Sequence, residues 1–366
     1  MTLYAHITGW GMCVPEKKLT NEALAQMVDT SDEWIRTRTG ISERHIAGNE
    51  DTTASLATEA ALRALEVANL RPDKVDLIIV STSTPEYIFP ATACIVQDRI
   101  GATKAGAFDL LAACTGFIFA LNMASQAIQN GTIKNAIVIG SETLSRIVDW
   151  EDRETCILFG DGAGAFVLQG RNDPGGYLSG VMRLDGSGGD LLNLPAGGSK
   201  IPTSLVTIHE GLHYIHMNGR EVFRFATRVM VQATQEAVQA AQLTLDDIQL
   251  VIPHQANLRI IEAAARGLGI PLERCMINLD RYGNTSTASI PIAACEAVES
   301  GRLKAGDKVV FVGFGAGLTW GASVVQWSAP SEVKRKVRPE RYRLLARLRS
   351  VLLRVIRHFE GLIWGK

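Results

Sequence analysis

The sequence predicts an α/β layered fold made of two similar halves. Short apolar runs alternate with longer, alanine-rich segments, which is the pattern of buried strands and the helices that cover them. The second half also repeats the first, because residues 69–79 match residues 242–252 without a gap at an offset of 173. A fainter match relates residues 126–134 to residues 296–304 at an offset of 170. Two copies of so long a unit predict two halves packed about a pseudo-twofold axis.

The expected elements follow one another as strand and helix through the first half. In order they are a strand at 3–13, short helices at 21–28 and from 31, an alanine-rich helix at 53–68, a strand at 75–80, a helix at 92–99, a buried strand from 108 that leads into an apolar helix after Cys114, and strands at 136–140 and 163–168. The second half contains the repeated strand at 250–252. We therefore divide the chain into residues 1–172, residues 173–328 and an extension over 329–366.

Composition narrows the class of protein. The chain has 366 residues, of which 46% are hydrophobic, so it can bury a large core. Its six cysteines show no C-x-x-C spacing, which predicts no metal site and favours reduced thiols in a cytoplasmic protein. The first residues lack the pattern of a signal peptide, and there is no run of eighteen apolar residues. We expect no nucleic-acid partner.

Cys114 is the first candidate catalytic residue. It follows a short strand and precedes an apolar helix, so backbone N–H groups and the helix dipole should favour its thiolate, the form that attacks carbonyl carbons. The alternative is that Cys114 is a small buried apolar residue, as most free cysteines are.

The repeat adds two further candidates. At an offset of 170 Cys114 corresponds to Asn284, and at an offset of 173 Ser81 corresponds to His254. His254 follows a buried strand, at the edge where open α/β sheets bind ligands. Because symmetry brings these edges together, we expect Cys114, His254 and Asn284 to share one cleft.

At this point a known family becomes recognisable. The segments that carry the resemblance are residues 29–35 (DTSDEWI), 112–117 (AACTGF), 159–164 (FGDGAG), 254–257 (HQAN), 283–286 (GNTS) and 313–321 (GFGAGLTWG). Over residues 3–328 the chain resembles the thiolase-fold condensing enzymes, and specifically the β-ketoacyl-acyl-carrier-protein synthase III family. The resemblance implies a thiolase-like αβαβα fold and a homodimer.

The resemblance also implies a reaction. Cys114 would take the acyl group of a short acyl-coenzyme A, and malonyl-acyl carrier protein would then lose CO2 and attack the acyl-cysteine. His254 and Asn284 would hold the enolate oxygen, and the backbone N–H groups of Cys114 and Ala316 would form the oxyanion hole. No cofactor is implied, since acyl-coenzyme A is a substrate. The product would be a 3-oxoacyl-acyl carrier protein that begins fatty-acid synthesis.

The family's substrate contacts carry over to particular residues. Those expected to bind coenzyme A are Thr30, Trp34, Arg38, Arg153 and Asn257, and those expected to contact the acidic carrier protein are Arg224, Arg259 and Arg266. Phe89 corresponds to a residue that the dimer partner inserts into the acyl pocket, which favours a short primer such as acetyl. Glu154 departs from the family, where glycine often follows the arginine.

The extension lies outside the resemblance. It carries a net charge of +8 against −9 for the rest of the chain. Residues 330–339 are predicted to form a linker, and residues 340–364 a basic amphipathic helix with a wide apolar face. Such a helix is typical of a segment on an anionic membrane surface, but it also fits packing on a partner or on the acidic body.

Three other functions remain open. The first alternative is a starter-unit condensing enzyme or acyltransferase of a specialised-metabolite pathway, which would keep Cys114 and His254 but use another acceptor. Asn284 argues against it, because the asparagine is needed chiefly for decarboxylation. A biosynthetic thiolase would need a second cysteine near the glycine-rich segment 313–321, which has none. A non-enzymatic acyl-binding scaffold is the hypothesis from a different class.

Overall fold

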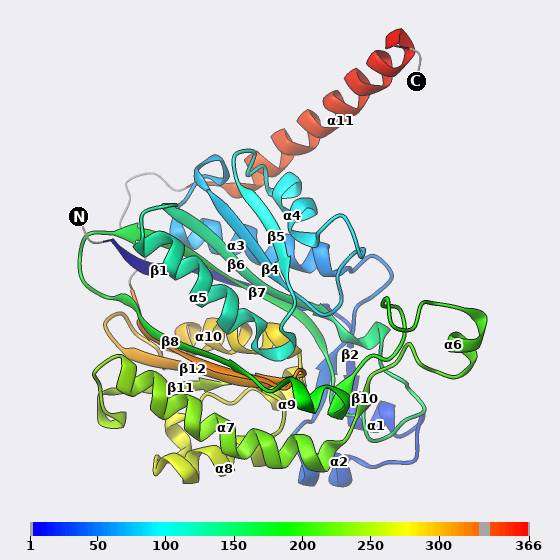
Figure 1. Ribbon diagram of the computed structural model, residues 1–366, viewed down its shortest axis with the longest axis vertical. Coiled ribbons are helices and arrows are strands. Elements are labelled where there is room, and N and C mark those ends of the chain that lie inside the picture. Colours follow the sequence, from blue (N-terminus) through cyan, green and yellow to red (C-terminus); the bar gives the residue numbers. More distant parts are fainter. Residues whose placement is uncertain (1–2, 329–336, 365–366) are drawn as a thin grey trace.

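The computed structural model describes residues 3–328 and 337–364 (Figure 1). Two mixed sheets form its centre. The first has the order β1-β7-β6-β4-β5 and the second the order β11-β12-β13-β8. The first sheet contains β1 (Tyr4–Cys13), β4 (Leu77–Ser81), β5 (Gly106–Leu110), β6 (Asn135–Thr143) and β7 (Asp161–Arg171). The second contains β8 (Gly176–Leu184), β11 (Leu250–Pro253), β12 (Lys308–Gly315) and β13 (Thr319–Gln326).

Helices form the other layers. Helix α3 packs on β1 and β7 outside the first sheet, and α7 packs on β12 and β13 outside the second. Between the sheets lie α5 and α10, whose Phe117, Leu121 and Ile290 belong to one buried cluster with residues of both sheets. The predicted αβαβα layering and the α/β class are therefore confirmed. The helices are α1 (Asn21–Leu24), α2 (Asp32–Thr39), α3 (Thr53–Ala68), α4 (Thr92–Ile100), α5 (Gly116–Gln129), α6 (Leu205–His209), α7 (Gly219–Ala240), α8 (Leu258–Leu268), α9 (Leu279–Tyr282), α10 (Ser289–Glu299) and α11 (Pro339–Trp364).

Two short strand pairs complete the topology. Strand β2 (Lys18–Thr20) pairs with β3 (Glu43–His45), and β9 (Leu192–Asn193) pairs with β10 (His216–Met217). No helix among the described residues has both the length and the apolar character needed to cross a membrane.

Strand β5 differs from the expected buried strand. It is the last strand of its sheet and pairs only with β4, so its side chains are partly or fully exposed. Phe108 is 38% exposed. The apolar sequence of β5 predicted a buried strand, but in the structure this strand forms an open, apolar edge of the sheet.

The internal repeat has an offset of 173 at the two turns that precede the central helices. The 3-10 turns Ala113–Thr115 and Ser286–Ala288 correspond, and α5 and α10 begin at Gly116 and Ser289. Ala113 and Ser286 also share an unusual positive φ, at 46° and 49°. Cys114 therefore corresponds to Thr287, and the predicted equivalence of Cys114 with Asn284 is wrong.

The error has a simple origin. Helix α10 has 11 residues and α5 has 14, so the offset falls to 170 only beyond the ends of these helices. There Gly131 corresponds to Gly301, and both have positive φ. The offset returns to 173 where β6 and β12 begin. The offset of 170 holds only for residues after α5 and α10. It was applied to Cys114, which lies before α5, where the offset is 173.

The C-terminal helix α11 leaves the body after one docked stretch. It contacts α4 and α3, and its outer turns project away from the two sheets (Figure 1). The predicted linker at 330–339 lies mostly outside the described residues, but the predicted helix is present.

Candidate active site

One large cavity brings the three predicted catalytic residues together. It has a volume of about 1400 Å³, and Cys114, His254 and Asn284 all line it. Its walls also include Trp34, Arg38, Arg153, Asn257 and Arg259. The cleft expected from the sequence is therefore present, even though the register argument for Asn284 was wrong.

Cys114 lies in the turn between β5 and α5, where small residues allow close packing. A Cβ atom on Gly315 would lie 2.8 Å from the Cys114 nitrogen, so the glycine lets β12 approach this turn. Burial raises the pKa of the Cys114 thiol to about 12, although a hydrogen bond with the Ser286 side chain acts in the opposite direction. Burial thus opposes the thiolate that the helix dipole was expected to favour.

His254 follows β11, and its ring is held by a neighbouring serine. Its Nδ1 lies 2.7 Å from the Ser289 hydroxyl oxygen, which also accepts a long hydrogen bond of 3.4 Å from the Gln255 N–H. When the serine hydroxyl donates its proton to Nδ1, the histidine proton lies on Nε2, and this is the tautomer that we assign. Burial lowers the pKa of His254 to about 3, so the ring is neutral.

The Nε2 atom of His254 faces no hydrogen-bond partner among the described residues, in contrast to Nδ1, and it is buried. A buried donor without a partner costs free energy, and such groups are tolerated where a ligand will satisfy them. The arrangement presents an Nε2–H donor to whatever enters the cavity.

Asn284 is fixed by its own backbone and side chain. Its N–H donates to the Leu158 carbonyl at 2.8 Å, and its carbonyl accepts from the Gly160 N–H at 3.0 Å. Its side-chain oxygen accepts from the Ser286 N–H at 2.8 Å. This contact identifies the amide oxygen and leaves the Nδ2 hydrogens as the donors available to the cavity.

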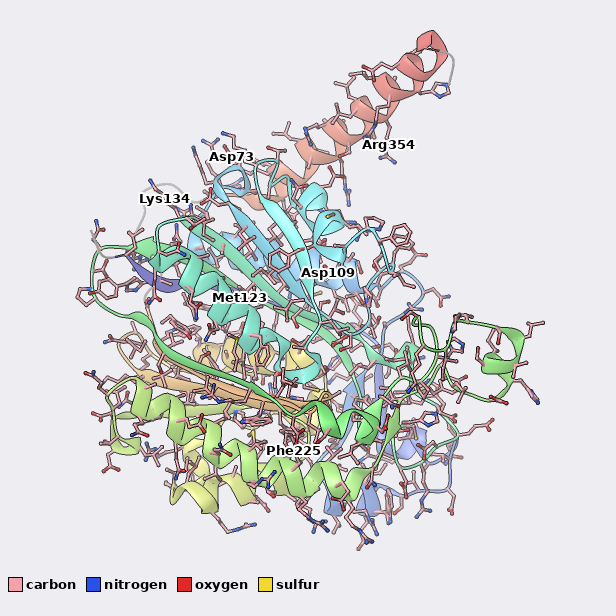
Figure 2. All side chains as sticks on the ribbon, viewed as in Figure 1. Asp73, Asp109, Met123, Lys134, Phe225 and Arg354 are labelled. Carbon is pink, nitrogen blue, oxygen red and sulfur yellow. The ribbon has the colours of Figure 1, made fainter. Side chains whose placement is uncertain are left out.

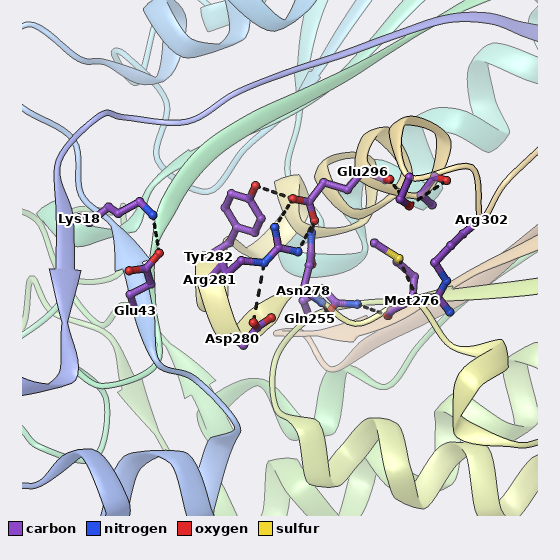
Figure 3. A network of polar contacts seen from close by, with 12 residues as sticks. Lys18, Glu43, Gln255, Met276, Asn278, Asp280, Arg281, Tyr282, Glu296 and Arg302 are labelled. Carbon is purple, nitrogen blue, oxygen red and sulfur yellow. Dashed lines mark hydrogen bonds and ion pairs between the residues drawn. The ribbon is translucent and has the colours of Figure 1, made fainter.

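A polar network holds the loop that carries Asn284. Glu296 of α10 accepts hydrogen bonds from Asn278 at 2.8 Å, from Arg281 at 2.6 and 2.8 Å, and from the Tyr282 hydroxyl at 2.7 Å (Figure 3). Gln255, next to His254, accepts from the Asn278 N–H at 3.0 Å. The same carboxylate thus ties α9 to α10 and supports the loop leading to Asn284.

Glu142 is a buried acid that sequence reasoning missed. Its carboxylate accepts a hydrogen bond from the Thr84 hydroxyl at 2.6 Å and bonds from the N–H groups of Ser83 and Thr84 at 3.1 Å. Ser286 links it to the site, because the serine side chain hydrogen-bonds with both Glu142 and Cys114. Its signal in the sequence was an acidic residue two positions after the apolar run 136–140.

Of the residues predicted to bind coenzyme A, Trp34, Arg38, Arg153 and Asn257 line the cavity and Thr30 does not. Trp34 has two guanidinium groups over its ring, with Arg38 at 4.5 Å and Arg153 at 4.7 Å from the ring centre. Asn257 caps α8 and donates to the Arg38 carbonyl at 3.0 Å. Thr30 does not line the cavity, and its buried hydroxyl has no partner among the described residues.

The remaining predicted contacts lie at or outside the rim of the cavity. Arg259 lines it and stacks on Phe223 at 5.7 Å, while Arg224 pairs with Glu221 on α7. Arg266 lies in the last turn of α8. Phe89 is 84% exposed and does not line the cavity of its own chain, and Ala316 follows Gly315 at its wall. The described residues contain no cluster of three or more side chains suited to a metal ion.

Comparisons with known proteins agree with this geometry. The family model 3-oxoacyl-[acyl-carrier-protein] synthase III matches residues 108–186, and the model of its C-terminal part matches residues 238–327. A β-ketoacyl-[acyl-carrier-protein] synthase III of Desulfitobacterium hafniense is 56% identical over 88% of this chain and 97% of its own length. One from Roseiflexus sp. is 50% identical over 90% of this chain and its own full length.

The chain is also similar to solved structures of the same family. The crystal structure of 3-oxoacyl-[acyl-carrier-protein] synthase III from Aquifex aeolicus superposes with a TM-score of 0.83. It is 47% identical and covers 88% of this chain and 100% of its own.

The buried Glu142 predicts a pH-dependent stability. Burial raises its pKa from an ordinary value near 4.5 to about 7. Because the folded state holds this proton more tightly, the stabilisation is complete below pH 4.5 and is lost as the pH rises through 7. We expect Glu142→Gln to remove about 2 to 3 kcal/mol of the decline in unfolding free energy between pH 5 and pH 8. Urea unfolding at both pH values measures this, and an unchanged decline in the variant would contradict it.

Proposed function

The chain belongs to the β-ketoacyl-[acyl-carrier-protein] synthase III family, and from this premise we propose how its residues carry out the family's reaction. The reaction is the decarboxylative condensation of a short acyl-coenzyme A with malonyl-acyl carrier protein, which initiates fatty-acid synthesis. The observation that carries the residue assignments is that Cys114, His254 and Asn284 line the same cavity as Trp34.

The first step moves the acyl group to Cys114. The sulfur attacks the thioester carbonyl of the acyl-coenzyme A, the carbon–sulfur bond to coenzyme A breaks, and the thiol proton of Cys114 leaves with coenzyme A. Since burial holds the pKa of this thiol near 12, the anion must be stabilised as it forms. Ser286 supports that charge through its hydrogen bond to Cys114, and the oxyanion is held by the N–H groups of Cys114 and Ala316.

The second step releases CO2 from malonyl-acyl carrier protein. The electrons of the breaking carbon–carbon bond form an enolate, and its oxygen accepts hydrogen bonds from His254 Nε2 and Asn284 Nδ2. Both donors suit this role because asparagine does not titrate and His254 stays neutral, with its pKa lowered to about 3.

The third step joins the two acyl units. The carbanion attacks the carbonyl carbon of acyl-Cys114, the same oxyanion hole receives the charge, and the carbon–sulfur bond breaks. The 3-oxoacyl-acyl carrier protein leaves, and the Cys114 thiolate takes up a proton from solvent, which is the one proton that the overall reaction consumes. No cofactor takes part in these steps.

The substrates enter past the aromatic and basic wall of the cavity. We propose that the adenine lies between Trp34 and Arg153, which requires Arg153 to move from the indole ring that it covers here. Arg38 and Asn257 of the cavity wall would complete the coenzyme A site, and the unpartnered hydroxyl of Thr30, which lies outside that wall, would join them when the ligand binds. Glu154 lines the same wall as Arg153, where it would oppose the phosphates of coenzyme A.

The carrier protein would approach over α7 and α8. Arg259 at the cavity rim, with Arg224 and Arg266 on the exposed faces of these helices, suits an acidic partner. This surface leaves the cavity accessible to a phosphopantetheine arm.

We also propose a homodimer formed through β5. This edge strand is open, and exposed apolar side chains surround it: Tyr87, Ile88, Phe89, Phe108, Leu111 and Met123. An open apolar edge is a template for pairing with a second chain. The dimer would let Phe89 of each chain close the acyl pocket of the other and favour a short primer.

The condensation assay tests the proposed reaction. With acetyl-coenzyme A and malonyl-acyl carrier protein, we expect acetoacetyl-acyl carrier protein, and we expect Cys114→Ala to lower its formation by at least about a thousandfold. Cys13→Ala is the matched control, because Cys13 lies on β1, outside the cavity and at the far edge of the sheet from β5, and should leave the rate unchanged. Full activity of Cys114→Ala would refute the assignment.

The dimer is tested by a charge at the open edge. We expect Phe108→Lys to shift the sedimentation of the chain from dimer to monomer and to reduce condensation, since each acyl pocket would lose its partner's Phe89. Gln232→Lys, which adds the same charge on the exposed face of α7, should remain dimeric. A dimer unaffected by Phe108→Lys would exclude this interface.

A further inference from the structure

Helix α11 is the one long element that the family does not account for. The family match ends at residue 327, whereas α11 spans Pro339–Trp364. In Figure 2 its Arg354 stands clear of the two sheets, on the part of the helix that projects from the body. The condensation chemistry uses no residue of this helix.

One stripe of α11 fixes the helix to the first half. Arg343 pairs with Glu59 of α3 at 2.5 Å, and the Ser350 hydroxyl donates to the Asp98 carboxylate of α4 at 2.6 Å. Ala346 is buried and lies close to Gly101, where an added Cβ would meet it at 3.3 Å. These positions recur every three or four residues, so they define one side of the helix.

The opposite side is apolar and has nothing packed on it in the described part of the chain. It consists of eight side chains, each between 41% and 61% exposed, which we call the apolar face: Leu344, Leu345, Leu348, Val351, Leu352, Val355, Ile356 and Phe359. At 100° per residue these positions span an arc of roughly 140°, wider than a coiled-coil seam. Exposed apolar surface of this extent marks an interaction site.

Basic side chains border the apolar face. Arg347, Arg354 and His358 lie along one edge and Arg349 along the other. The arginines Arg347, Arg349, Arg354 and Arg357 form no ion pair with any described residue, whereas Arg343 on the docked side does. The acidic side chains of the helix are only Glu340 and Glu360, near its two ends.

This charge pattern distinguishes between occupants. If the apolar faces of two α11 helices met, their arginine borders would also meet, and like charges at that distance repel. An anionic lipid surface instead offers an apolar layer for the apolar face and negative headgroups for the arginines. We propose that α11 lies flat on an anionic phospholipid surface through its apolar face and holds the enzyme there.

The docked stripe gives this contact a defined geometry. Because Arg343, Ala346 and Ser350 face the body, the body lies on the side of α11 away from the lipid. The cavity with Cys114 takes no part in the contact, so the variants below leave the catalytic residues intact. The proposal is also independent of the reaction, since lipid binding can be measured without substrates.

Co-sedimentation with vesicles tests the proposal on the full chain. We expect the chain to bind vesicles of phosphatidylcholine with about 30% phosphatidylglycerol, a composition that mimics an anionic membrane. We expect little binding to vesicles of phosphatidylcholine alone. Binding to the anionic vesicles should weaken as the salt concentration increases. Leu348→Glu combined with Val355→Glu should weaken binding at least tenfold. Gln235→Glu combined with Gln239→Glu adds the same charge on exposed positions of α7 and should bind as the unmodified chain does.

Each other outcome overturns the proposal. Equal binding by the apolar-face variant and the unmodified chain would exclude this face, and equal binding to neutral vesicles would exclude the role of the arginines. If no vesicles are bound and the apolar-face variant has a smaller mass in sedimentation velocity, the occupant is a second copy of this chain. A truncated chain ending at Ser328 that still binds would place the lipid contact elsewhere.

Discussion

The close contact of the two strand-to-helix turns at the pseudo-twofold axis is the constraint on which the site depends. The Thr287 hydroxyl donates to the Ser81 hydroxyl at 2.8 Å, and the Thr115 hydroxyl donates to that of Thr319 at the same distance. There is no room for larger side chains, because a Cβ on Gly140 would lie 2.4 Å from the Thr287 carbonyl oxygen and one on Gly116 would lie 2.0 Å from the Ser81 hydroxyl. Each turn therefore packs on a strand of the other half through hydroxyl groups and glycines, and the residues beside the turns are buried.

Burial at this contact sets the chemistry. It holds the thiol of Cys114 and the ring of His254 neutral, raising one pKa and lowering the other. Equivalent positions in the two halves carry different residues. Ser289, which orients His254, corresponds to Gly116 in the first half. His254 itself corresponds to Ser81. One half supplies the nucleophile and the other supplies the hydrogen-bond donors.

The sequence was sufficient for the layered fold, for the family and for the meeting of Cys114 with His254 and Asn284 in one cavity. It was not sufficient for register, because a three-residue difference between α5 and α10 is invisible in a match made beyond the helices. It also did not reveal the link from Cys114 through Ser286 to Glu142, since those residues are far apart in the chain and meet only across the contact between halves. The exposure of β5 was missed because an apolar run looks the same at an open edge as in a core.

The most direct test of the account is the separation of acyl transfer from decarboxylation. Unmodified chain and Asn284→Ala are each incubated with acetyl-coenzyme A, and the acetyl group is located by peptide mass spectrometry before and after malonyl-acyl carrier protein is added. The account predicts one acetyl group on the Cys114 peptide in both proteins, and its rapid discharge only in the unmodified chain. Acetylation of another residue, or equally rapid discharge by Asn284→Ala, would contradict it.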